Sequence, residues 1–183
     1  VTNTAAGLLD IYDVTNGVPE RRGSVQVGVD PVSVRFRTNA EAWVVNHISD
    51  SVSIVDTVAQ RVTATIATGD EPCDVVFAGS PQRAFVSCSQ INSIQRFDPA
   101  NLAAAPTTIS VLAEEPRALA VAPDGLTVYA AIFESGNGST IIAGGNDGMD
   151  FVRALLHDAP PHMAASAALV LEIGNERDHF EAV

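Results

Sequence analysis

The chain has few residues that could carry chemistry, and their spacing does not assemble them into a known kind of site. Its four histidines are scattered, and none has a carboxylate or a cysteine at the spacing of metal ligands. They are His47, His157, His162 and His179. No serine lies in a Gly-x-Ser-x-Gly turn, so serine-hydrolase chemistry has no support. The sequence therefore predicts no catalytic, cofactor-binding or metal-ligating residue, and we expect His47 to be a solvated loop residue.

Cys73 and Cys88 lie at the far ends of two predicted strands that are joined by the hairpin loop 79–82. If Ala78 lies opposite Arg83, the antiparallel ladder places Cys73 opposite Cys88. Opposite residues of such a ladder can come within disulfide range, so the spacing predicts a Cys73–Cys88 disulfide, which suits an oxidising compartment. Two separately buried free thiols are the alternative. Without a Cys-x-x-Cys motif, either arrangement is structural.

Three aspartates recur at regular intervals along the chain. Asp13, Asp56 and Asp98 are 43 and 42 residues apart, and each follows a run of alternating apolar residues. An aspartate at the end of a strand commonly accepts hydrogen bonds from nearby backbone N–H groups of a turn. We therefore expect turn residues, repeated once per structural unit, rather than acids for catalysis.

The regular unit spans 31–71 and contains four short runs of alternating apolar residues separated by polar turns. These runs are 32–36, 42–46, 51–56 and 62–67. An acidic residue followed by proline marks the start of each unit, at Pro31, Pro72 and Pro116. Four strands in a period of about 40 to 45 residues are typical of propeller blades. The predicted fold class is all-β: a β-propeller of four-stranded antiparallel blades, about 3.5 blades in an incomplete ring, followed by a short α/β piece.

The repeat divides the chain into five predicted parts. They are a partial blade at 1–30, complete blades at 31–71 and 72–115, a partial blade at 116–143, and a helix–strand–helix segment at 144–183. An incomplete ring exposes sheet edges. Either the chain is a piece of a larger propeller, which we favour because terminal repeats need caps, or two copies close one ring as a homodimer.

The composition limits the possible partners. The chain of 183 residues has a net charge of −12, with ten arginines and no lysine, which argues against binding to nucleic acid or to anionic membranes. No run of about 18 apolar residues is present, so no membrane span is expected. An unidentified protein or small ligand remains as the expected partner.

The first four-fifths of the chain, about residues 1–143, resemble the YVTN-type propeller repeat. The matching pieces are Val1–Asn3, Trp43–Asn46, Ser51–Thr57 and Thr63–Ile66. The resemblance implies a bacterial or archaeal protein that is periplasmic, secreted or on the cell surface. It favours a non-catalytic binding or scaffold module, with a lactonase-like propeller enzyme as the alternative, since propellers host many functions.

Residues 144–183 are similar to the closing part of ribosomal-protein glutamine methyltransferases. The matching pieces are a Gly-x-Asp-Gly-Met-Asp lead-in, a Leu-Val-Leu-Glu-Ile-Gly-Asn-Glu strand and a His-Phe-Glu-Ala helix. That family implies a Rossmann-like fold and S-adenosylmethionine as cofactor. Its glycine-rich cofactor loop and Asn-Pro-Pro-Tyr clamp do not occur in this sequence. The resemblance therefore predicts a remnant without a cofactor rather than a working methyltransferase.

Overall fold

The computed structural model describes residues 1–15, 17–134, 153 and 157 of the chain. The chain divides into two compact units, Val1–Phe133 and Glu134–Val183. Of the second unit, the structure describes Glu134, which ends a strand, and Arg153 and His157, which are helical and exposed. The predicted boundary between 143 and 144 lies outside the described residues, as does the rest of the predicted segment 144–183.

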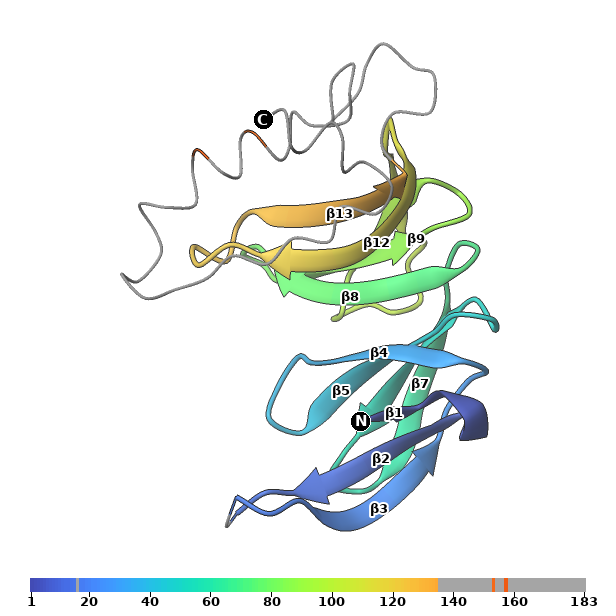
Figure 1. The fold of residues 1–183 in the computed structure, drawn as a ribbon, viewed down its shortest axis with the longest axis vertical. Coiled ribbons are helices and arrows are strands. Elements are labelled where there is room, and N and C mark those ends of the chain that lie inside the picture. Colours follow the sequence, from blue (N-terminus) through green and yellow to red (C-terminus); the bar gives the residue numbers. More distant parts are fainter. Residues whose placement is uncertain (16, 135–152, 154–156, 158–183) are drawn as a thin grey trace. The chain divides into compact units, whose positions relative to one another are not determined.

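The described part of the first unit consists of four successive β-sheets, which Figure 1 shows as ribbons running from blue to orange. The first sheet contains β1 (Thr2–Asn3), β2 (Leu8–Asp13) and β3 (Glu20–Gln26), with a 3₁₀ turn η1 (Thr4–Ala6) after β1. The second contains β4 (Pro31–Phe36), β5 (Glu41–Asn46), β6 (Ser51–Asp56) and β7 (Arg61–Ala67). The third contains β8 (Pro72–Ala78), β9 (Arg83–Cys88), β10 (Ser93–Phe97) and β11 (Thr107–Ser110). The fourth contains β12 (Glu114–Val121) and β13 (Val128–Glu134).

The predicted blades are confirmed. The two complete sheets are antiparallel meanders in which each strand pairs with the next one along the chain. Within the described residues, the first sheet has three strands and the fourth has two. We call the four sheets blades 1 to 4. Their first strands β4, β8 and β12 contact one another in sequence, as expected of the strands nearest the axis of a propeller.

The acidic residue before each repeated proline has an unusual backbone conformation. Asp30, Glu71 and Glu115 have φ angles of 58°, 52° and 55°, in the left-handed region that residues other than glycine rarely adopt. A side chain from the preceding hairpin supports two of these turns. Asp50 Oδ1 accepts a hydrogen bond from the Glu71 backbone N–H at 2.9 Å, and Asn92 Oδ1 accepts one from Glu115 at 2.9 Å. The acidic-proline marker in the sequence is thus a turn that starts each blade.

The repeated aspartates are turn residues, as predicted, at two of their three positions. Asp56 Oδ1 accepts hydrogen bonds from the backbone N–H groups of Val58 and Ala59 at 2.9 and 2.8 Å. Asp98 Oδ1 accepts one from Ala100 at 3.0 Å. At the third position, Asp13 forms an exposed ion pair with Arg22 at 3.8 Å.

The main hydrophobic core lies between blades 2 and 3. It contains ten buried residues: Trp43, Val45, Val52, Ile54, Ile66, Val75, Ala84, Val86, Cys88 and Phe97. Trp43 is fully buried, and its ring meets Phe77 edge-on with centroids 5.3 Å apart. The core between blades 1 and 2 is smaller, with four buried residues: Leu9, Val25, Val44 and Val55. Burial of apolar surface therefore holds blade 2 more firmly to blade 3 than to blade 1.

Candidate functional site

A polar cluster joins the first strands of three blades. Asp74 of β8 is buried, and its Oδ1 accepts a hydrogen bond from Ser33 Oγ of β4 at 2.6 Å. Its Oδ2 accepts bonds from an Arg35 guanidinium nitrogen of β4 at 3.1 Å and from the backbone N–H of Leu119 of β12 at 3.0 Å. One carboxylate therefore ties β4, β8 and β12 together.

The donors around Asp74 fit a structural role better than a catalytic one. Oδ1 also accepts a bond from the Val75 backbone N–H at 2.9 Å, so four donors engage the carboxylate. A shallow cavity of about 280 Å³ lies beside it. Arg117, which lines this cavity, forms an ion pair with Glu115 at 2.6 Å and lies 4.0 Å from the centre of the Phe133 ring. Asp74 is the one carboxylate among the described residues that line this cavity.

His47 lies in the turn after β5, as expected of a loop residue, and its side chain lies near two acceptors. Its side chain is 24% exposed, because Nδ1 lies 3.1 Å from the carbonyl oxygen of Pro72 and Nε2 lies 3.8 Å from Glu71 Oε2. Nδ1 can donate to this carbonyl oxygen only in the tautomer that carries the proton on Nδ1. Cys73 Sγ lies 3.9 Å from the same nitrogen.

The predicted pairing of Cys73 with Cys88 is wrong, and both are free thiols. The ladder follows the predicted register from Ala78↔Arg83 as far as Asp74↔Ser87, but Pro72 rather than Cys73 then lies opposite Cys88. Cys73 is the extra residue of a β-bulge, which shifts the register by one and leaves it without a direct partner in the ladder. Of the two alternatives, the structure therefore shows separate thiols.

The two thiols are expected to be poorly reactive in the folded protein. Burial raises the pKa of Cys73, and burial raises the pKa of Cys88 from an ordinary value of 9.0 to about 12. Since the thiolate is the reactive form, native Cys88 should react with iodoacetamide roughly a thousand times more slowly than an ordinary thiol. Labelling followed by mass spectrometry measures these rates, with urea-unfolded protein as the control. If each cysteine reacts at the same rate in the native and in the unfolded protein, the two thiols are not buried.

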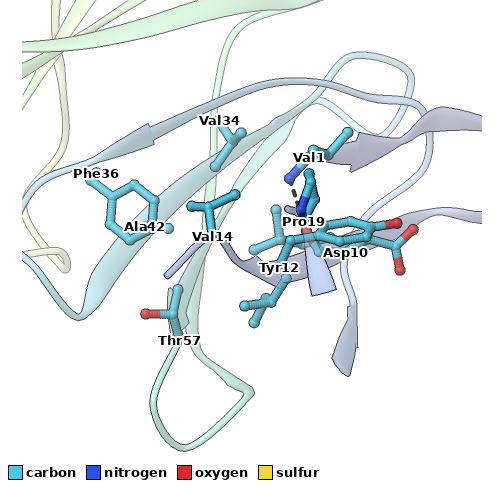
Figure 2. A pocket seen from close by; sticks show the side chains of 11 residues that line it. Val1, Asp10, Tyr12, Val14, Pro19, Val34, Phe36, Ala42 and Thr57 are labelled. Atoms are coloured by element: carbon cyan, nitrogen blue, oxygen red, sulfur yellow. Dashed lines mark hydrogen bonds between the residues drawn. The ribbon is translucent and has the colours of Figure 1, made fainter. Parts of the chain in front are cut away.

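An apolar groove lies on blades 1 and 2, and Figure 2 shows it from close by. It has a volume of about 410 Å³ and is lined by residues of β2, β4 and β5 and of nearby loops. The lining residues are Val1, Leu9, Asp10, Ile11, Tyr12, Val14, Pro19, Val34, Phe36, Ala42 and Thr57. Most of these residues are apolar. One of them, Phe36, has a side chain that is 61% exposed. We call this cavity the apolar groove.

The sequence did not predict the apolar groove. Alternation along each strand indicates which side chains face a neighbouring blade, but not how completely that neighbour covers them.

Other classes of site receive no support from the described residues. Within the ranges that the structure describes, no group of three or more His, Cys, Asp and Glu side chains could hold a metal ion. No helix among these residues is long and apolar enough to cross a membrane.

The chain is similar to known proteins in two separate ways, while no family model matches it. By sequence, 41 residues are 63% identical to the ribosomal protein uL3 glutamine methyltransferase of Bordetella pertussis. The match covers 22% of this chain and only 14% of that protein.

By structure, the chain is similar to the hydrazine synthase of Kuenenia stuttgartiensis, with a TM-score of 0.66 and 27% identity. This match covers 75% of the chain and 39% of that protein. It is also similar to virginiamycin B lyase from Staphylococcus aureus, with a TM-score of 0.59, 13% identity and coverage of 73% and 45%. The chain thus spans less than half the length of either protein. Together with the four-stranded meanders, these likenesses establish the fold as a β-propeller that is incomplete in the described residues.

Proposed function

We propose that residues 1–134 belong to a larger β-propeller, in which they act as a non-catalytic binding or scaffold module outside the cytoplasm. The observation that carries the proposal is the succession of four-stranded antiparallel meanders, of which the described residues contain two complete ones. A closed propeller usually needs four to eight such blades.

Exposed apolar side chains support this proposal at both ends. On blade 4 and the turn before it, Leu112, Leu126, Tyr129 and Phe133 are each more than 60% exposed. Val1, Val14 and Phe36 are similarly exposed beside the apolar groove. Large apolar side chains gathered at the surface of a soluble protein commonly mark an interface. The fact that the chain spans 39% of hydrazine synthase and 45% of virginiamycin B lyase is consistent with further blades.

The non-catalytic part of the proposal is supported by the surroundings of Asp74. Four donors engage its carboxylate, as in a structural hydrogen-bond cluster. The location outside the cytoplasm is supported by the resemblance to the YVTN-type repeat.

An immunoblot of fractionated source cells tests the proposal directly. An antibody raised against residues 31–115 should detect a polypeptide clearly larger than the 19.1 kDa of this chain, in the periplasmic or secreted fraction. A cytoplasmic protein of 19.1 kDa would contradict both the larger propeller and the location.

The methyltransferase match supports a second candidate, an S-adenosylmethionine-binding remnant in the C-terminal unit. The 63% identity over 41 residues favours it, whereas the sequence lacks the glycine-rich cofactor loop of that family. Calorimetric titration of the full chain with S-adenosylmethionine separates the two possibilities. We expect no measurable heat of binding, and a micromolar affinity would establish the second candidate.

A further inference from the structure

Two arginines line the shallow cavity beside Asp74, although the chain as a whole is strongly acidic. Arg35 belongs to β4 and Arg117 to β12, and the side chain of each is 51% exposed. The other lining residues carry no charge at neutral pH: Val32, Ser33, Cys73 and Ala118. The lining therefore has two positive charges and one negative charge, in a chain whose net charge is −12.

The negative charge of Asp74 is shared among four donors, so it occupies only part of the Arg35 guanidinium. One nitrogen of Arg35 bonds to Asp74 Oδ2 at 3.1 Å. The same oxygen accepts a bond from the Leu119 backbone N–H, and Oδ1 accepts bonds from Ser33 and Val75. A guanidinium has five N–H donors, so most of those of Arg35 remain for another acceptor in the cavity.

The guanidinium of Arg117 is held in place without the use of most of its donors. Its central carbon lies 4.0 Å from the centre of the Phe133 ring, and one nitrogen pairs with Glu115 Oε2 at 2.6 Å. The contact with the ring is a cation–π attraction, which needs no hydrogen-bond acceptor. A side chain that is already positioned loses less conformational entropy when it binds a ligand.

The positive charge of Arg117 acts inside the cavity. Burial raises the pKa of the Cys73 thiol, which lines the cavity, and the charge of Arg117 counteracts part of that rise. Glu71 and Glu115 each have a smaller effect in the opposite direction. The field of Arg117 therefore favours negative charge at the position of this sulfur.

The size of the cavity and the charge of the chain limit the kind of occupant. The volume of about 280 Å³ is just below the range of about 300 to 1,000 Å³ that is typical of small-molecule sites. The net charge of −12 disfavours polyanions such as nucleic acid. The planar fork of a guanidinium matches the oxygen atoms of a carboxylate or a phosphate group.

We propose that the cavity between β4, β8 and β12 binds a small organic anion, whose carboxylate or phosphate group is held by Arg35 and Arg117. The proposal deepens the proposed binding function and rests on it, because it names the class of ligand that the module takes. Since the two arginines belong to blades 2 and 4, the bound anion would link these blades from the side of the cavity.

Titration of the full chain with inorganic phosphate, and separately with malonate, tests the proposal. Sodium chloride at the same ionic strength is the control. The readouts are the melting temperature and the rate at which iodoacetamide labels Cys73, which is followed by mass spectrometry. A ligand at about ten times its dissociation constant leaves roughly one cavity in eleven empty, so the labelling of Cys73 should slow about tenfold.

Substitution of the arginines separates a specific site from a general effect of charge. Arg117→Met should weaken anion binding at least about tenfold, because charge-assisted hydrogen bonds are lost. Arg117→Lys should weaken it less, since lysine keeps the charge but not the fork. Arg61→Met removes one positive charge from an exposed position outside the cavity and should leave binding unchanged. Arg35→Met should also weaken binding, and its unfolding midpoint is measured alongside because Arg35 pairs with Asp74.

Two results would overturn the proposal. If neither phosphate nor malonate protects Cys73 or raises the melting temperature beyond the chloride control, the cavity is not an anion site. If Arg61→Met weakens binding as much as Arg117→Met, the effect comes from the overall charge. Protection by one of the two anions alone supports the proposal and identifies the group that is bound. These measurements do not depend on the size or location of the native polypeptide, so they can fail while the immunoblot test succeeds.

Discussion

Replacing Trp43 with alanine should lower the free energy of unfolding by about 4 kcal/mol. Its side chain is fully buried in the core between blades 2 and 3, and removal of a buried tryptophan costs the transfer free energy as well as the cavity left behind. The loss should appear in urea unfolding followed by circular dichroism, as a lower midpoint with an unchanged slope.

Phe36→Ala is the matched control for this substitution. Phe36 is also an aromatic residue beside a blade interface, but it is 61% exposed, so its replacement should change stability by about 0.5 kcal/mol or less. Equal losses for the two substitutions would mean that the core between blades 2 and 3 does not dominate the stability of the propeller.

Replacing Asp74 with alanine should lower the free energy of unfolding by about 3 kcal/mol. The substitution leaves the buried backbone N–H of Leu119 and the hydroxyl of Ser33 without their acceptor, and it removes the ion partner of Arg35. Hydrogen bonds to a charged group contribute roughly 1.5 to 3 kcal/mol each, and an unsatisfied buried donor adds its desolvation cost. Chemical unfolding of the variant and the original chain measures the difference.

Asp70→Ala controls for the loss of one negative charge from the same segment. Asp70 is exposed, so its replacement should change stability by about 0.5 kcal/mol or less. Asp74→Asn should cause a loss of stability between those of Asp70→Ala and Asp74→Ala, because the amide keeps one acceptor oxygen for the donors of the three strands. A loss for Asp74→Ala as small as that for Asp70→Ala would show that the carboxylate does not hold the blades together.

The repeat was sufficient to predict the blades, because strand length, turn residues and alternation are local properties of the sequence. The strand 51–56 was predicted with the bounds that the structure has. The partner of Cys73 could not be predicted by counting residues outward from the hairpin loop. One extra residue in a bulge leaves the strand intact but shifts the register of its pairing.

The role of Asp74 was missed for a different reason. It depends on which strands of neighbouring blades meet, and a single strand does not contain that information. A signal was nevertheless present, because Ser33 and Asp74 both follow the repeated proline by two residues. Polar side chains at the same position of two predicted first strands are unexpected in a core, and they indicate a hydrogen bond between blades. The groove was missed likewise, because coverage by a neighbouring blade is not a local property.

The bonds of Asp74 have a consequence for how the propeller unfolds. In an array of repeats, stability is usually a sum of terms between nearest neighbours, so distant repeats respond to each other weakly. A single side chain of blade 3 that bonds to both blade 2 and blade 4 makes these two blades energetically dependent on each other. Detachment of β12 would remove one of the two donors to Asp74 Oδ2 and so alter the bond of that oxygen to Arg35. The first strands of the blades, β4, β8 and β12, should therefore open as one cooperative group. The last strands of blades 2 and 3, β7 and β11, can fray alone.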